Sequence, residues 1–230
     1  MKDIILDQRL QAVVDLLGHG HTVVDVGCDH GYVANYLVEN DLAEKVYASD
    51  VSEPSLRKNQ RFAYLRGNED RVISVLGDGL RPLKGKDFDT VIIAGMGGDL
   101  IIKILQDSFD QIKDKTLILQ PMTQRSGLRK YLVANGFKIQ RETIVRDKNK
   151  FYEIFKAVPG EDLGSSCDYA FGQNLIEEKD PVLKEYLLFL LKKNQNYIKK
   201  AAMSKTAKGQ ERRQYLENEI ELYKELLNDY

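Results

Sequence analysis

Apolar residues along the chain follow two alternating patterns, short β-rich runs and stripes with helical spacing. The runs predict strands over residues 22–26, 45–50, 72–76, 89–94 and 116–120. The stripes predict helices over residues 5–17, 31–39, 54–66, 99–106 and 124–135. Because neighbouring parallel strands need a crossover between them, this alternation predicts βαβ units and a largely parallel sheet.

The pattern changes after Gly136. Two β-rich segments, 137–145 and 151–158, follow with only residues 146–150 between them, which is enough for a hairpin and too short for a helical crossover. A parallel sheet that ends in an antiparallel hairpin resembles the class I methyltransferase fold, whereas ordinary dinucleotide-binding sheets continue in parallel. We therefore predict an α/β protein with a Rossmann-like sheet of that class and a terminal antiparallel hairpin.

The last part of the chain is predicted to be a helical unit. Residues 159–174 contain proline, several glycines and two serines, which is typical of a link between domains. Beyond it, two segments show coiled-coil-like spacing, so we predict a catalytic domain over residues 1–160 and a helical hairpin over 161–230 that breaks near 204–209. The spaced positions are Leu183, Leu187, Leu190, Asn194, Tyr197 and Ala201, then Leu216, Ile220, Tyr223 and Leu227.

Composition narrows the class of protein. The chain has 230 residues, of which 30% are charged, and no apolar run approaches the roughly 20 residues that span a bilayer. Charged residues among the first nine positions argue against a signal peptide, so we expect a cytoplasmic protein with no membrane contact. Cys28 and Cys167 are far apart, so we expect reduced thiols and no metal site. We also expect a monomer.

The strongest chemical signal lies at the end of the first predicted strand, where residues 23–31 are Val-Val-Asp-Val-Gly-Cys-Asp-His-Gly. Gly27 and Gly31 allow a sharp turn and allow a ligand to lie against backbone N–H groups at the start of a helix. A dinucleotide fingerprint would have glycine at Asp29 and needs no acid at Asp25. Acids here suit the ammonium and sulfonium of S-adenosylmethionine. The alternative is a plain strand-to-helix turn.

Two more acids follow later strands. Asp50, before Val51, ends the second strand about 20 residues beyond the glycine loop, where an acid can accept hydrogen bonds from ribose hydroxyls. Its alternative role is that of an acid before a helix. Asp78 and Gly79 follow the third strand, where class I methyltransferases often place an acid against the adenine amino group. An ordinary Asp-Gly turn explains this pair as well.

The fourth and fifth strands end in residues that suit a methyl acceptor. Residues 93–98 are Ile-Ala-Gly-Met-Gly-Gly, at the strand end that lies over the reactive methyl group in this fold. The Asn/Asp-Pro-Pro-aromatic sequence of exocyclic-amine methyltransferases is absent, and the glycines leave room for a base or a backbone segment. Gln120 can hydrogen-bond a base edge and Tyr32 can stack on a base. The alternatives are a flexible loop, a solvated amide and a core aromatic.

A local basic face is needed for contact with nucleic acid, because the formal net charge is only −1. Basic residues gather on the first C-terminal helix and just after it, with Glu211 the only acid among them. This cluster is typical of a phosphate-binding face and equally of an ordinary solvated helix. Its members are Lys192, Lys193, Lys199, Lys200, Lys205, Lys208, Arg212 and Arg213.

Together these residues resemble the bacterial TrmK family, tRNA methyltransferases that modify N1 of the adenosine at position 22. The similarity spans nearly the whole chain. It rests on Gln-Arg-Leu at 8–10, Asp-Val-Gly-Cys-Asp-His-Gly-Tyr at 25–32, the run at 93–98, Leu-Gln-Pro at 119–121 and Phe-Tyr-Glu-Ile at 151–154. The chain departs from the family pattern at Ala34, where many members have proline, and at Ala-Ser-Asp-Val 48–51, where some relatives have a Gly-Glu-Val form.

The resemblance implies S-adenosylmethionine as methyl donor and a C-terminal hairpin that helps to hold tRNA. We assign catalytic roles to Asp29 and His30. We assign cofactor binding to Asp25, Gly27, Cys28, Asp29, Gly31, Asp50, Val51, Asp78, Gly79, Ala94, Gly95 and Met96. We assign substrate binding to Tyr32, Gly97, Gly98, Gln120, Lys192, Lys193, Lys199 and Lys200.

The chemistry expected from this assignment is attack of adenine N1 on the methyl carbon, in line with the departing sulfur. The ring nitrogen has a free lone pair, so positioning supplies most of the acceleration and no strong general base is required. Two rivals share part of the pattern. A methyltransferase for a small molecule or a protein would not need the basic hairpin, and a non-catalytic RNA-binding protein would show no cofactor affinity. Asp29 and the terminal hairpin disfavour a nicotinamide-dependent oxidoreductase.

Overall fold

The computed structural model describes residues 3–161, 169–201 and 207–230. It divides into two compact units, Met1–Phe171 and Gly172–Tyr230, so the division falls after Phe171 and not after residue 160. None of the helices in these described stretches has the length and apolar character needed to cross a bilayer.

The first unit is built on a seven-stranded sheet with the order β3-β2-β1-β4-β5-β7-β6. Strands β1 to β5 are parallel, whereas β7 is antiparallel to both β5 and β6, so the predicted class I methyltransferase sheet with a terminal hairpin is confirmed. The strands are β1 (Thr22–Val26), β2 (Lys45–Asp50), β3 (Val72–Leu76), β4 (Thr90–Met96), β5 (Thr116–Pro121), β6 (Phe137–Asp147) and β7 (Lys150–Pro159).

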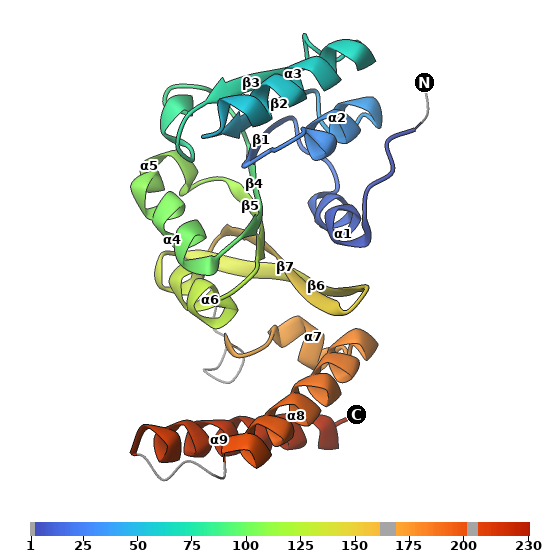
Figure 1. The fold of residues 1–230 in the computed structure, drawn as a ribbon. Helices are drawn as coiled ribbons and strands as arrows, with labels where there is room; N and C mark the ends of the chain where they lie inside the picture. Colours follow the sequence, from blue (N-terminus) through green and yellow to red (C-terminus); the bar gives the residue numbers. More distant parts are fainter. Residues whose placement is uncertain (1–2, 162–168, 202–206) are drawn as a thin grey trace. The chain divides into compact units, whose positions relative to one another are not determined.

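Helices cover both faces of this sheet (Figure 1). Alternate strand residues point to opposite faces, so Val23 and Val46 pack with the first three helices while Val24 and Ile93 pack with the next three. The helices of the first face are α1 (Gln8–Leu17), α2 (Tyr32–Glu39) and α3 (Glu53–Arg66). Those of the second are α4 (Gly98–Asp107), α5 (Phe109–Ile112) and α6 (Arg125–Ala134).

Local capping explains where the helices begin. The prediction started the first helix at residue 5, but the carboxylate of Asp7 accepts the Leu10 N–H at 2.7 Å and caps α1, so the helix begins at Gln8. Ser52 caps α3 in the same way through the Ser55 N–H. The short helices were not predicted, because four or five residues carry no periodic signal. They are α5, α7 (Gln173–Glu177) and the 3₁₀ turn Arg81–Leu83.

The second unit contains α7 and two long helices that pack on each other, α8 (Pro181–Ala201) and α9 (Ala207–Asn228). Several of the predicted spaced positions are buried, among them Leu183, Leu187 and Leu216. The seam is not wholly apolar, because the Asn194 amide and the Tyr223 hydroxyl both donate to the Glu219 carboxylate. Of the predicted break at 204–209, residues 204–206 lie outside the described residues, and residues 207–209 belong to α9.

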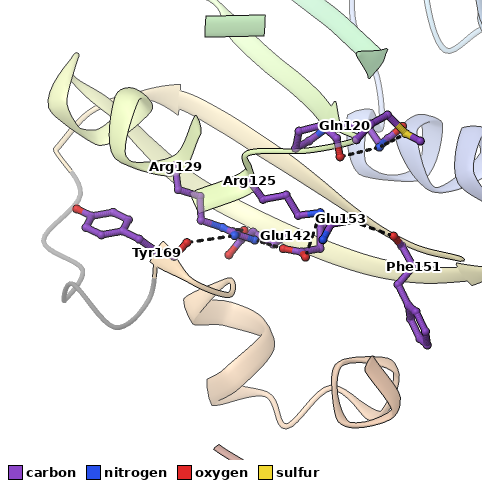
Figure 2. Close-up of polar contacts among 9 residues, drawn as sticks. Gln120, Arg125, Arg129, Glu142, Phe151, Glu153 and Tyr169 are labelled. Atoms are coloured by element: carbon purple, nitrogen blue, oxygen red, sulfur yellow. Dashed lines mark hydrogen bonds and ion pairs between the residues drawn. The ribbon is translucent and has the colours of Figure 1, made fainter. Parts of the chain in front are cut away.

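A buried ion cluster fastens the terminal hairpin to α6 (Figure 2). Arg129 of α6 is 1% exposed and donates to Glu142 of β6 at 2.8 Å and to Glu153 of β7 at 2.5 Å. Its guanidinium also lies 4.3 Å from the centre of the Phe155 ring. Burial alone would lower the pKa of Arg129, but the two carboxylates outweigh it and raise that pKa, so the cation is kept.

Replacing Arg129 by methionine should destabilise the protein by about 3–5 kcal/mol, because two buried carboxylates lose their shared cation. Urea unfolding followed by circular dichroism measures this free energy. Adding Glu142→Leu and Glu153→Leu to Arg129→Met should recover most of the loss, since a packed apolar cluster tolerates burial. A loss from Arg129→Met as small as that from Arg57→Met, at an exposed position of α3, would show that the cluster does not hold the hairpin.

Candidate functional site

One cavity of about 340 Å³ opens at the carboxyl ends of the parallel strands. Residues from the ends of β1, β2, β3 and β4 and from one face of α4 line it, so the strand ends converge as the βαβ order predicts. The lining residues are Val26, Gly27, Ser49, Asp50, Val51, Gly77, Asp78, Gly79, Met96, Leu100 and Ile104.

The turn after β1 is closed by backbone hydrogen bonds to the neighbouring strand. The N–H groups of Gly27 and Cys28 both donate to the Ser49 carbonyl, at 2.8 and 3.1 Å. These two N–H groups are therefore already bonded within the protein. Gly27 contributes in another way. Its φ is +75°, and a Cβ there would come within 2.3 Å of Met96 Cε, so glycine keeps the cavity wall open.

Asp50 lines the cavity, and its carboxylate is held in place by two backbone N–H groups. One carboxylate oxygen accepts the Ser52 N–H at 2.8 Å and the other accepts the Asp29 N–H at 3.2 Å. These bonds orient the carboxylate at the strand end, and carboxylate oxygens can accept further hydrogen bonds beyond two. Asp29, with φ +45°, takes the left-handed conformation that this bond requires.

Asp25 is buried beside Asp50 and is not among the residues that line the cavity. Burial, together with the charge of Asp50, raises the pKa of Asp25 to about 7. The neighbouring Cys28 is also buried, and burial with the charges of Asp25 and Asp50 raises the pKa of its thiol. The thiol therefore stays protonated and is unsuited to nucleophilic chemistry. The site favours positive charge, and a cationic ligand would ease the repulsion between the two acids.

Gly31 has a packing role in this structure. Its φ is +73°, and a Cβ there would lie 1.8 Å from Asn59 Oδ1. The Asn35 amide donates to the Gly31 carbonyl at 2.9 Å, and the Asn59 amide donates to the Ser74 hydroxyl at 2.9 Å. Asn35 and Asn59 are fully buried, so a chain of amides holds the loop between β1 and α2 against α3 and β3.

The glycines after β4 have different roles. Gly98 is buried, and a Cβ there would meet the carbonyl oxygens of Thr123 and Gln124 at 2.6 and 2.8 Å. It serves close backbone packing, not the approach of a base. Gly97 caps α4 with its backbone, and a Cβ would lie 3.2 Å from Thr123 Oγ1. Gly95, near the end of β4, is exposed with φ +80°, and a Cβ there would lie 3.4 Å from Arg9 Nη1.

Gln120 is a positioning residue in this structure. Its side chain is fully buried, and its oxygen accepts both Arg9 Nη1 at 3.0 Å and the Gly95 N–H at 3.1 Å. Its amide nitrogen donates to the Pro121 carbonyl at 3.0 Å. Gln120 therefore has no exposed surface for a base edge, in contrast to the expectation from sequence. It ties the turn after β4 to α1 through Arg9.

Two aromatic residues, the partly exposed His30 and the exposed Tyr32, follow the first turn. His30 and Tyr32 stack with ring centres 5.6 Å apart and planes 7° from parallel, and Tyr32 meets Phe62 edge-on. Tyr32 is 47% exposed, so it is not the core aromatic of the alternative interpretation. His30 Nδ1 lies 2.8 Å from Asp29 Oδ2, so Asp29 orients the imidazole. The stack offers a flat surface on which a base can lie.

The second unit carries exposed cations next to exposed rings. Lys193 Nζ lies 6.0 and 5.9 Å from the ring centres of Phe189 and Tyr197, and the guanidinium of Arg212 lies 5.1 Å from that of Tyr215. Lys192, Lys199 and Lys208 are exposed as well. The side chains of Lys200 and Lys205 lie outside the described residues. Alternating cations and rings are typical of nucleic-acid-binding faces.

Half of the predicted cofactor residues line the cavity. They are Gly27, Asp50, Val51, Asp78, Gly79 and Met96. Asp25, Cys28, Asp29, Gly31, Ala94 and Gly95 lie beside it or behind it and are not among its lining residues. The prediction missed Val26, Ser49, Gly77, Leu100, Ile104 and the supporting Arg9. Leu100 and Ile104 are four residues apart on a predicted helix, so their common face was available as a signal.

The described side chains include no group of three or more His, Cys, Asp and Glu placed to hold a metal ion. The cavity instead combines apolar walls from Val51, Leu100 and Ile104 with the carboxylates of Asp50 and Asp78. This combination fits a nucleoside, whose base is flat and apolar and whose ribose and amino groups donate hydrogen bonds.

Comparison with known proteins identifies relatives of this chain. A curated protein of Bacillus subtilis (strain 168), tRNA (adenine(22)-N(1))-methyltransferase, is 28% identical, and the match covers 99% of each chain. The crystal structure of the B. subtilis m1A22 tRNA methyltransferase TrmK superposes with a TM-score of 0.87 at 27% identity, covering 98% of this chain and 100% of that one.

A second solved structure contains the methyl donor. Streptococcus pneumoniae Sp1610 in complex with S-adenosyl-L-methionine superposes with a TM-score of 0.87 at 29% identity, covering 97% of this chain and 100% of that one. The sequence model of the TrmK family, described as tRNA (adenine(22)-N(1))-methyltransferase, matches residues 23–225. This chain therefore belongs to the TrmK family.

Proposed function

We propose that this protein transfers the methyl group of S-adenosylmethionine to N1 of adenosine 22 in tRNA. The observation that carries the proposal is the single cavity in which Asp50, Asp78 and Gly27 meet at the ends of neighbouring parallel strands. Its apolar walls and fixed acids suit an adenosyl group, and the buried Asp25 behind it favours a cationic ligand.

Different residues of the cavity bind different parts of the cofactor. Asp50, oriented by the Asp29 and Ser52 N–H groups, accepts hydrogen bonds from ribose hydroxyls, and Asp78 accepts one from the adenine amino group. Val51, Leu100 and Ile104 cover the base, while Gly27 and Met96 form the wall on the β1 and β4 side. When bound, S-adenosylmethionine supplies a methyl group on a sulfonium, which is already a strong methyl donor.

For the reaction to proceed, the acceptor adenine has to be oriented toward the methyl group, and no proton has to be removed from it. Adenine N1 has a lone pair, and its methylated product can remain cationic, so no general base has to act. The stacked His30 and Tyr32 provide a platform for an adenine flipped out of the tRNA. Asp29 holds the imidazole of His30, and Gly95 is exposed near the end of β4. These residues therefore act by positioning.

The helical hairpin supplies the wider contact with tRNA. Its exposed lysines and rings, including Lys192, Lys193 and Lys199, bind phosphates and unpaired bases. We also propose that the protein acts in the cytoplasm as a monomer.

Incubating the protein with radiolabelled S-adenosylmethionine and an in vitro transcript of a bacterial tRNA tests the reaction. Label should appear as 1-methyladenosine at position 22, and a transcript with guanosine at that position should stay unlabelled. Methylation of both transcripts alike, or of neither, would contradict the proposed function.

Asp50→Asn should weaken binding of S-adenosylhomocysteine by about 10- to 100-fold, because a neutral amide replaces a charged acceptor of ribose hydroxyls. Calorimetry measures the dissociation constant. Asp110→Asn, at an exposed position of α5, is the matched control and should leave the affinity unchanged. The same affinity in both variants would remove Asp50 from the cofactor site.

Charge reversal at Lys193 and Lys199 should weaken tRNA binding and make the binding less dependent on salt, because two phosphate contacts are lost. Filter binding at a series of salt concentrations measures both effects. Affinity for S-adenosylhomocysteine should not change. Lys224→Glu on α9, where Lys224 pairs with Glu221, serves as the control. If the double variant binds tRNA like the control, the hairpin face has another purpose.

A further inference from the structure

The tip of the hairpin formed by β6 and β7 carries a group of cations. Residues 146–150 are Arg-Asp-Lys-Asn-Lys, so three cations accompany one acid. Lys148 and Lys150 are exposed, and neither forms an ion pair with the side chains that the structure describes. Lys148 has φ +55°, a backbone conformation that Gly, Asn or Asp adopts at lower cost. A lysine at this position of the turn therefore suggests a role for its charge.

The register of the sheet places this tip at the edge where the cofactor cavity opens. β7 runs antiparallel to β5, with Phe155 opposite Leu119, so the start of β7 extends past the carboxyl end of β5 at Pro121. At about 3.3 Å per residue, the turn at Lys148 and Asn149 lies roughly 15 Å beyond that end. Figure 1 shows the tip projecting from the sheet. The lysines of the tip therefore stand on the side of the sheet on which a target base has to bind.

The base of the tip is held by arginines of two helices. Arg125 Nη2 of α6 donates to the Phe151 carbonyl at 3.3 Å, and its Nε lies 3.4 Å from a carboxylate oxygen of Glu153 (Figure 2). The guanidinium of Arg9 in α1 lies 5.8 Å from the centre of the Tyr152 ring. The start of β7 is thus fixed to both α1 and α6, so the lysines of the tip extend from a fixed support.

The charge of the tip indicates which ligand it fits, and this step rests on the proposed function. Lysines without a protein partner bind phosphates as point charges, and a polynucleotide presents one phosphate at every nucleotide. An adenosine that is flipped out for methylation has to lie at the carboxyl edge of the sheet. The phosphates on either side of it pass along the same edge, within reach of a tip that projects beyond it.

We propose that Lys148 and Lys150 bind tRNA phosphates next to the target adenosine, so that the tip of the β6–β7 hairpin is a second tRNA-binding surface, on the first unit itself. Contacts at this place act on the nucleotide that reacts, because a phosphate held at the tip keeps the flipped adenosine at the carboxyl edge. The exposed lysines of α8 and α9 belong to the other unit and contact tRNA independently of this surface.

Neutralising the two lysines together tests this surface. Lys148→Gln with Lys150→Gln should weaken tRNA binding by about 10-fold at low salt and reduce the slope of log affinity against log salt by about 2, because two phosphate contacts are lost. Filter binding of the full-length protein over a salt series measures both effects. Affinity for S-adenosylhomocysteine, measured by calorimetry, should not change. The matched control is Lys84→Gln with Lys86→Gln, two exposed lysines at the same spacing that precede β4.

Cross-linking tests the place of the contact separately. The photoreactive residue p-benzoylphenylalanine in place of Asn149, between the two lysines, should cross-link to nucleotides that neighbour adenosine 22, as mapped by primer extension. Cross-links confined to nucleotides far from position 22 in the folded tRNA would overturn the proposal, and so would a double variant with the affinity and salt slope of the Lys84 and Lys86 control. Wild-type protein that methylates no adenosine of tRNA would instead contradict the proposed function itself.

Discussion

The parallel register of β3, β2, β1 and β4 is the constraint on which the site depends. Asp50 pairs with Leu76, and Val26 pairs with Ser49 on one side and Ile93 on the other, so these strands end at the same edge. The loop residues that follow these strands therefore lie close together at this edge of the sheet. The same register brings Asp25 close to Asp50, and the resulting repulsion is tolerated in an otherwise apolar layer. A cationic cofactor relieves that repulsion, which links the stability of the edge to its ligand.

The rest of the first unit supports this edge from outside the cavity. The amides of Asn35 and Asn59 hold the loop after β1, while Gln120 and Arg9 hold the turn after β4. The hairpin of β6 and β7 completes the sheet. Its two buried carboxylates pair with Arg129 of α6, and Glu153 pairs with Arg125 as well. Glu153, part of the Phe-Tyr-Glu-Ile run that resembles the TrmK family, therefore has a structural role in that cluster.

Sequence patterns were sufficient for the strands, the order of the long helices and the family. Their periodicity is local, and the predicted bounds of β1, β2 and β3 agree with the structure. The contacts of individual side chains were harder to predict from the sequence, because they involve residues that are distant along the chain. The sequence does not show that Gly31 packs against Asn59 or that Gly98 packs against the backbone at Thr123. Gln120 was expected to meet a base and is buried under Arg9, 111 positions away in the sequence.

A crystal structure of the protein with S-adenosylhomocysteine tests the central claim most directly. The account predicts adenine against Asp78, ribose hydroxyls on the Asp50 carboxylate and the amino-acid end directed over β1 toward the turn after β4. Density for the ligand in another cavity, or in the reverse direction along the same strand ends, would contradict it.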